Sequence, residues 1–117
     1  MEDKKGQRIV LLILMLMSFS VFAHDDDSPP QLWSWFKDLN KSVKECRSES
    51  LYALETLKVR NIVQNQYGIY GIYRSNRIVV KCLEMKNKSK VWVAVAGFDK
   101  APVEALRNKI LNEIKVK

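Results

Sequence analysis

Chemistry in this chain would have to come from a small set of reactive side chains. The 117 residues include two cysteines, Cys46 and Cys82, and a single histidine, His24. Cysteines this far apart favour a structural disulfide, because redox pairs usually form a Cys-x-x-Cys sequence. If the mature chain begins at His24, its imidazole and α-amino group offer nitrogen ligands to Cu(II). With no second histidine such a site would stay open, so we predict no functional metal and no cofactor.

The other polar residues form no recognisable catalytic set. Because no histidine follows His24, Ser-His and Cys-His nucleophile systems are excluded from the body of the chain. No phosphate-binding glycine loop and no His-Glu-x-x-His sequence occurs. A hydrolase of the paired-carboxylate type needs two acids that converge in a cleft, and the acids here are scattered. We therefore predict no catalytic residues and no enzymatic activity.

Residues 1–23 have the layout of a secretory signal peptide. A start with two lysines and an arginine precedes an apolar run, and the run leads to a small-residue exit, Val-Phe-Ala, ending at Ala23. The stretch 9–23 is shorter than the roughly 20 residues that a membrane-spanning helix needs. We expect cleavage near Ala23, a periplasmic or secreted protein in a bacterium, and no integral membrane span in the mature chain.

After cleavage the chain would be short and basic. Residues 24–30, "HDDDSPP", are predicted to be a flexible acidic leader, and residues 31–117 a single domain. Of the 20 lysines and arginines 17 lie from Gln31 onward, as do 8 of the 13 acidic residues. This excess of positive charge favours anionic partners, although scattered surface charge also serves solubility alone.

The first part of the domain has a helical pattern. Apolar residues recur in steps of three and four from Leu32 to Leu57, which predicts one helix with Cys46 on its inward side. Ser28 would cap this helix, and the prolines at 29–30 suit its first turn. A break near residues 48–50 is an alternative, because Ser-Glu-Ser also suits a new helix start.

Beyond Leu57 the period of the apolar residues changes from 3.6 to two, which indicates strands. The predicted order is strands at 59–63, 68–74, 77–85 and 91–97, a turn at Ser75-Asn76, a polar loop at 86–90, and a helix that Asp99 caps with Pro102 in its first turn. A helix, three or four antiparallel strands and a second helix make a two-layer α+β domain. In an oxidising compartment, a Cys46–Cys82 disulfide would join the first helix to the middle of the sheet.

Three segments, "CRSESLYALETLKV", "YGIYGIYRSNRIVVKCLE" and "VWVAVAGFDKAPVEALRNKI", carry a resemblance. Together they resemble a type of small exported bacterial domain of unknown function, in which a helix precedes a glycine-centred strand, a "V-x-C" strand, a "V-A-G" strand and a final helix. The resemblance covers residues 46–114. It implies a bacterial envelope location and the two-layer fold, and it transfers no catalytic residue.

The predicted sheet has one face that the helices leave uncovered. In the strand at 77–85 this face carries Val79, Lys81 and Leu83, because side chains alternate along a strand. Exposed apolar side chains that lie together tend to mark an interaction site. We therefore predict a partner surface made of these three residues, with Tyr70 or Tyr73 near its margin.

Two classes of function follow. The first is a small secreted or periplasmic binding or accessory module that acts through contact with an envelope protein or a second copy. An inhibitor or immunity-type protein acting on an exported effector is a concrete version. The alternative is a module that binds anionic glycans, lipid head groups or nucleic acid through Lys86, Lys88 and Lys90 together with the arginines. Phosphate contacts would make that binding strongly dependent on salt, which separates the two classes.

Overall fold

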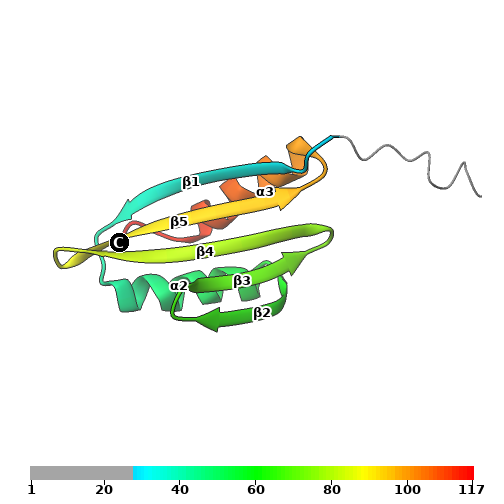
Figure 1. The fold of residues 1–117 in the computed structure, drawn as a ribbon. Helices are drawn as coiled ribbons and strands as arrows, with labels where there is room; N and C mark the ends of the chain where they lie inside the picture. The colour runs from blue at the N-terminus through cyan, green and yellow to red at the C-terminus, as the bar shows by residue number, and fades with distance from the viewer. Residues whose placement is uncertain (1–27) are drawn as a thin grey trace, which may run out of the picture.

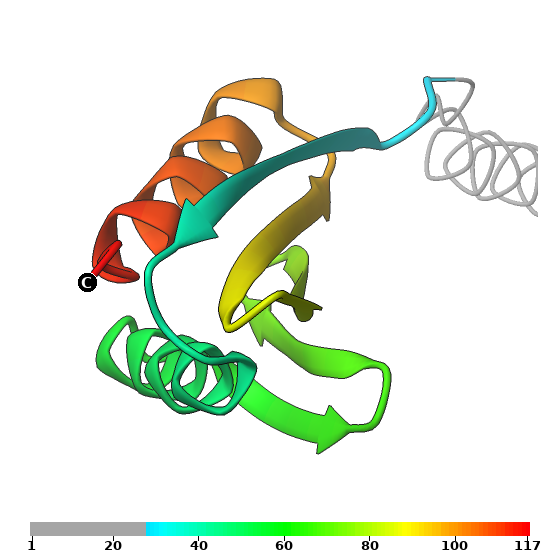
Figure 2. The ribbon, with the colours of Figure 1, turned by 90° about the vertical axis from the view of Figure 1, so that its left-hand side faces the viewer.

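The chain folds into an antiparallel five-stranded sheet with two helices on one side. The computed structural model describes residues 28–117, so the predicted signal peptide and most of the acidic leader lie outside the described residues. The elements are β1 (Gln31–Leu39), α2 (Val43–Thr56), β2 (Arg60–Asn65), β3 (Gly68–Tyr73), β4 (Asn76–Met85), β5 (Lys88–Gly97) and α3 (Lys100–Glu113). The strand order is β1-β5-β4-β3-β2 (Figure 1). Figure 2 shows both helices on the same side of the sheet. The predicted α+β class is confirmed.

The first strand is the largest departure from the prediction. The expected helix from Leu32 to Leu57 is wrong in its first half, because residues 31–39 pair with β5 from Gln31↔Gly97 to Leu39↔Ser89. The sheet therefore has five strands, not three or four. Two tryptophans and a phenylalanine in this segment favour a strand. Pairing along the whole length of β5 outweighs the accidental helical spacing of the apolar residues.

Helix α2 begins at a local capping signal in the sequence. Ser42 is the N-cap of α2, and its hydroxyl oxygen accepts a hydrogen bond from the backbone N–H of Glu45 at 3.1 Å. Ser42 and Glu45 have the spacing of a capping box. The helix then runs unbroken through residues 48–50, so the predicted alternative of a break there is wrong. Ser50 is fully buried on the inner side of α2, beside the sulfur of Cys82 at 3.6 Å.

The four strands after α2 form the predicted meander, with shorter connections than expected. The turn between β3 and β4 is Arg74-Ser75, not Ser75-Asn76, and Arg74 has the positive φ of 54°. Asn76 begins β4 and is buried against Gly97, where any side chain would collide with it. The predicted loop at 86–90 is likewise wrong, because residues 88–90 already belong to β5.

The core lies between the sheet and the helices. The inner sides of β4 and β5 supply five residues that are at most 2% exposed, which are Ile78, Val80, Val91, Val93 and Val95. The predicted stripe of α3 packs on them through Val103, Leu106 and Ile110. Asp99 occupies the N-cap position of α3 but makes no side-chain capping bond. The Cys46–Cys82 disulfide is confirmed, and it joins α2 to β4.

Candidate binding surface

The side of the sheet away from the helices, here called the outer face, faces the viewer in Figure 1. Directly paired residues of an antiparallel sheet point to the same side, so the register gives the composition of this face. Its residues are Arg60, Val63 and Asn65 of β2, Gly68, Tyr70 and Ile72 of β3, Arg77, Val79, Lys81, Leu83 and Met85 of β4, Lys88, Lys90, Trp92, Ala94 and Ala96 of β5, and Leu32, Ser34, Phe36 and Asp38 of β1.

Most of the predicted partner surface is brought together on this face. Val79, Lys81 and Leu83 alternate along β4, and Tyr70 of β3 pairs directly with Val79. Leu83 is 40% exposed, while Val79 and Tyr70 are half-buried. Tyr73 is not part of the outer face, because it packs against the core beneath the sheet. Tyr70 and Tyr73 therefore lie on opposite sides of β3.

A shallow apolar hollow, the outer hollow, lies where β2, β3 and β4 meet. Val63, Tyr70, Ile72 and Val79 line it together with Arg77, and it has an open volume of about 330 Å³. A bulge in β2, between Arg60 and Val63, interrupts the ladder beside it, and bulges re-aim nearby side chains. Sequence reasoning missed Val63 and Ile72 here. The alternation along 68–73 gave a signal for Ile72, but the bulge hid the side on which Val63 lies.

Aromatic side chains extend the outer face toward β1. Phe36 of β1 is opposite Trp92 of β5 and is 49% exposed. The ammonium of Lys90 lies 4.6 Å from the centre of the Phe36 ring and 3.6 Å from the Asp38 carboxylate. The prediction of a helix for residues 31–39 placed neither Phe36 nor Asp38 on the sheet, so both were missed.

Charge on the outer face is strongly one-sided. It carries five cationic side chains, Arg60, Arg77, Lys81, Lys88 and Lys90, and one acidic side chain, Asp38. The other acidic residues of the described chain lie on the helices, at the start of α3 or on the helix-facing side of β4: Glu45, Glu49, Glu55, Glu84, Asp99, Glu104 and Glu113. The outer face therefore carries an excess of positive charge beside its exposed apolar side chains.

The three lysines predicted as anion contacts do not form a loop cluster. Lys86 lies in the β4–β5 turn with Asn87, whereas Lys88 and Lys90 project from β5. Lys90 is already engaged with Asp38 and Phe36. The geometry thus joins Lys88 and Lys90 to the outer face and separates them from Lys86.

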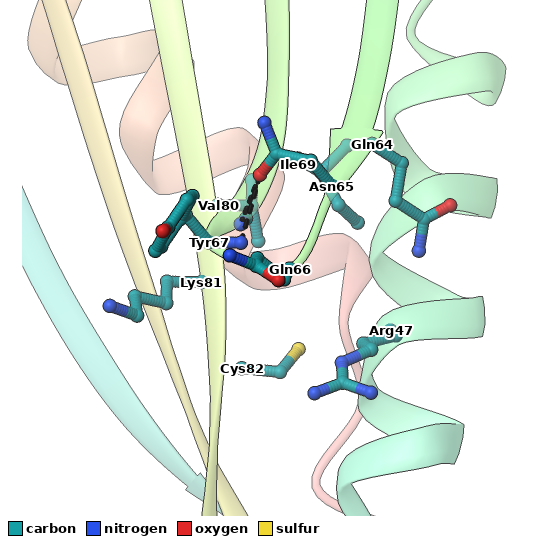
Figure 3. Close-up of a pocket in the computed structure, with 10 residues that line it drawn as sticks. Arg47, Gln64, Asn65, Gln66, Tyr67, Ile69, Val80, Lys81 and Cys82 are labelled. Carbon is teal, nitrogen blue, oxygen red and sulfur yellow. Dashed lines mark hydrogen bonds between the residues drawn. The ribbon is translucent and has the colours of Figure 1, made fainter.

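A second hollow lies near the disulfide. Figure 3 shows Arg47 of α2, the end of β2 and the turn after it (Gln64 to Tyr67), and Cys82 of β4 around this hollow. The side-chain oxygen of Asn65 accepts hydrogen bonds from the backbone N–H groups of Tyr67 and Gly68, at 2.8 and 3.2 Å, and so fixes the turn. This second hollow has a volume of about 30 Å³. It can hold water but no organic ligand, because ligand sites usually enclose about 300 Å³ or more.

Within residues 28–117 no three histidine, cysteine, aspartate or glutamate side chains gather as they would around a metal ion. None of the helices in this part of the chain has both the length and the apolar character to cross a bilayer. Comparison with protein-family models, with curated proteins and with solved structures found no match for this chain.

Proposed function

We propose that this chain is an exported binding module that contacts a protein partner through the outer face and performs no catalytic step. The observation that carries the proposal is the exposure of apolar side chains on a sheet face that no helix covers. Val63 is 55% exposed, Phe36 49% and Leu83 40%. Apolar side chains gathered on one face, among charged ones, characterise interaction surfaces. The disulfide supports an oxidising compartment for the mature protein.

The dimensions of the outer face suit a protein more than a small molecule. The strands of the sheet lie about 4.8 Å apart. The longest, β4 and β5, have ten residues each with a rise of about 3.4 Å per residue. The outer face therefore measures about 650 Å². A stable protein interface buries about 800 Å² on each side. The outer hollow is shallow and open, so it fits one side chain of a partner better than an enclosed ligand.

The anion-binding alternative has weaker support. It relied on three lysines in one loop together with the arginines, and of the lysines only Lys86 lies in the turn. Lys90 is already paired with a carboxylate, so an anion would have to displace Asp38. Binding through the apolar part of the outer face should depend less on ionic strength than binding through phosphate contacts.

The proposal is tested by placing a charge in the middle of the outer face. The mature protein, its Val79→Lys variant and a control, Tyr52→Lys, are immobilised and exposed to envelope extract. Tyr52 is 71% exposed on α2, so it matches the apolar-to-lysine change on the opposite side of the molecule. We expect wild type and Tyr52→Lys to retain the same proteins and Val79→Lys to lose them.

Circular dichroism and thermal unfolding establish that all three proteins are folded to the same extent. Light scattering of the wild type reports whether a second copy is bound. If Val79→Lys retains the same proteins as the wild type, or if the wild type neither retains a protein nor self-associates, the proposed function is wrong.

A further inference from the structure

We propose that the partner of the outer face is an acidic protein, whose carboxylates meet Arg77 and Lys81 while one of its apolar side chains enters the outer hollow. This inference rests on the proposed function and adds the chemistry of the partner. Arg77 lines the outer hollow, and Lys81 lies four residues along the same strand on the same side. The hollow and the two cations therefore form one contact area of mixed character.

The cations of the outer face lack carboxylate partners within the described chain. Lys90 is paired with Asp38 at 3.6 Å. Across residues 28–117 no carboxylate oxygen lies within 4.0 Å of the other four, which are Arg60, Arg77, Lys81 and Lys88. On a protein surface, opposite charges across an interface fix orientation and speed association, whereas like charges exclude a partner. An acidic surface is the one that this face selects.

A second copy is a poor occupant for the same reason. In a two-fold contact the same patch lies on both sides of the interface. Two outer faces would then place five cationic side chains from each copy in one interface, with one Asp38 from each. Like charges placed opposite each other across an interface oppose association, so this face suits a different protein.

An anionic membrane is less suitable because of how the apolar side chains lie. Side chains that anchor a protein in a membrane must extend into the boundary between head groups and acyl chains. Tyr70, Ile72 and Val79 are instead half-buried around the outer hollow, while the more exposed Phe36, Val63 and Leu83 project from three different strands. A recess receives a side chain, as a binding site for a protein does.

The experiment uses peptides as the probe. A phage-displayed library of random peptides is selected on the immobilised mature wild type, and an enriched peptide is synthesised. Its affinity is measured for the wild type, for Val79→Lys, for Arg77→Glu/Lys81→Glu and for the control Lys44→Glu/Lys109→Glu. The control changes the net charge equally but alters exposed lysines on α2 and α3. A neutral double variant, Arg77→Gln/Lys81→Gln, serves if the glutamates disturb folding.

We expect enriched peptides to combine aspartate or glutamate with an apolar residue. The Arg77→Glu/Lys81→Glu variant should bind the synthesised peptide at least about tenfold more weakly than the wild type, a change of about 1.4 kcal/mol. The control should bind as the wild type does. Enrichment of neutral or basic peptides would overturn the inference of an acidic partner and leave the proposed function standing. Equal binding by Arg77→Glu/Lys81→Glu and by the control Lys44→Glu/Lys109→Glu would do the same. Binding that Val79→Lys leaves unchanged contradicts the proposed function itself.

Binding to vesicles distinguishes an acidic protein partner from an anionic membrane. The wild type and Arg77→Glu/Lys81→Glu are sedimented with vesicles of phosphatidylcholine alone and with added phosphatidylglycerol. We expect no binding of the wild type to either. Binding to the anionic vesicles alone, lost in the charge-reversed variant, would replace the acidic protein by an anionic lipid surface.

Discussion

The two sides of strands β4 and β5 serve different purposes. Toward the helices these strands present branched aliphatic residues such as Ile78 and Val93, which are at most 2% exposed. On the outer face their immediate neighbours include half-buried Val79 and exposed Lys81. Nearly all of the buried apolar residues lie on the covered side, and the outer face carries four cations without a carboxylate partner in the described part of the chain. Substitutions on the covered side should therefore change stability, and those on the outer face should change binding.

The largest effect on stability should come from removing the disulfide, which ties α2 to the covered side of β4. Cys46 and Cys82 are separated by 36 residues, and closing a loop of this length stabilises a fold by about 4 kcal/mol. We expect Cys46→Ala/Cys82→Ala to lose about that much free energy of unfolding, as measured by urea denaturation. The fraction that remains folded should bind the synthesised peptide as the wild type does.

Two results would contradict this view of the disulfide. Unchanged stability of the double variant would show that the loop is already restrained in the unfolded chain. Loss of peptide binding by folded molecules would show that the disulfide shapes the outer face, and the separation of the two sides would then fail.

Adjacent residues on β4 give the most direct comparison of the two sides. Ile78 points into the core and Val79 points outward. Removal of buried methyl and methylene groups leaves a cavity, so Ile78→Ala should cost about 3 kcal/mol. Val79→Ala should cost much less, because Val79 is only half-buried. Chemical denaturation of both variants measures the difference, and similar losses would mean that the outer face is as tightly packed as the core.

The sequence predicted those parts of the fold that local patterns determine. Alternation along 68–97 and the 3.6-residue period of α3 identified the meander, the last helix and the inward position of Cys82. The same alternation placed Val79, Lys81 and Leu83 together on the outer face. These residues are neighbours within one strand, so no knowledge of the rest of the sheet was needed.

The sequence did not predict what depends on distant pairing. β1 is a strand because residues 31–39 pair with β5, fifty or more residues later. Spacing within the segment alone resembles a helix. Ser42 and Glu45 did mark the true start of α2, but the apolar stripe that ran through them hid the signal. Phe36 and Val63 join the outer face only through the register of β1 and the bulge in β2, which no local pattern encodes.

The smallest effect concerns a lysine that β1 places on the covered side. The Lys37 ammonium donates hydrogen bonds to the carbonyl oxygens of Leu111 and Ile114, at 3.0 and 2.5 Å, and so caps the end of α3. Lys37→Met keeps the aliphatic stem but removes the donors, which should cost about 1 kcal/mol. The control is Lys81→Met on the outer face. Its stability should stay within about 0.5 kcal/mol of the wild type, since Lys81 is exposed.

The stability difference between wild type and Lys37→Met should also depend on pH in the alkaline range. Burial, followed by the charges of Lys115 and Lys41, lowers the pKa of Lys37 from its ordinary value of 10.5. Between that lowered pKa and 10.5, the unfolded chain holds more of the proton than the folded chain, so this group makes the free energy of unfolding rise with pH. Lys37→Met lacks this pH-dependent contribution. As pH rises through this range, the difference in free energy of unfolding between wild type and Lys37→Met should therefore widen, as measured by urea denaturation. A gap that narrows there would show that the hydrogen bonds to α3 hold the proton on Lys37 more strongly than burial and the neighbouring lysines expel it.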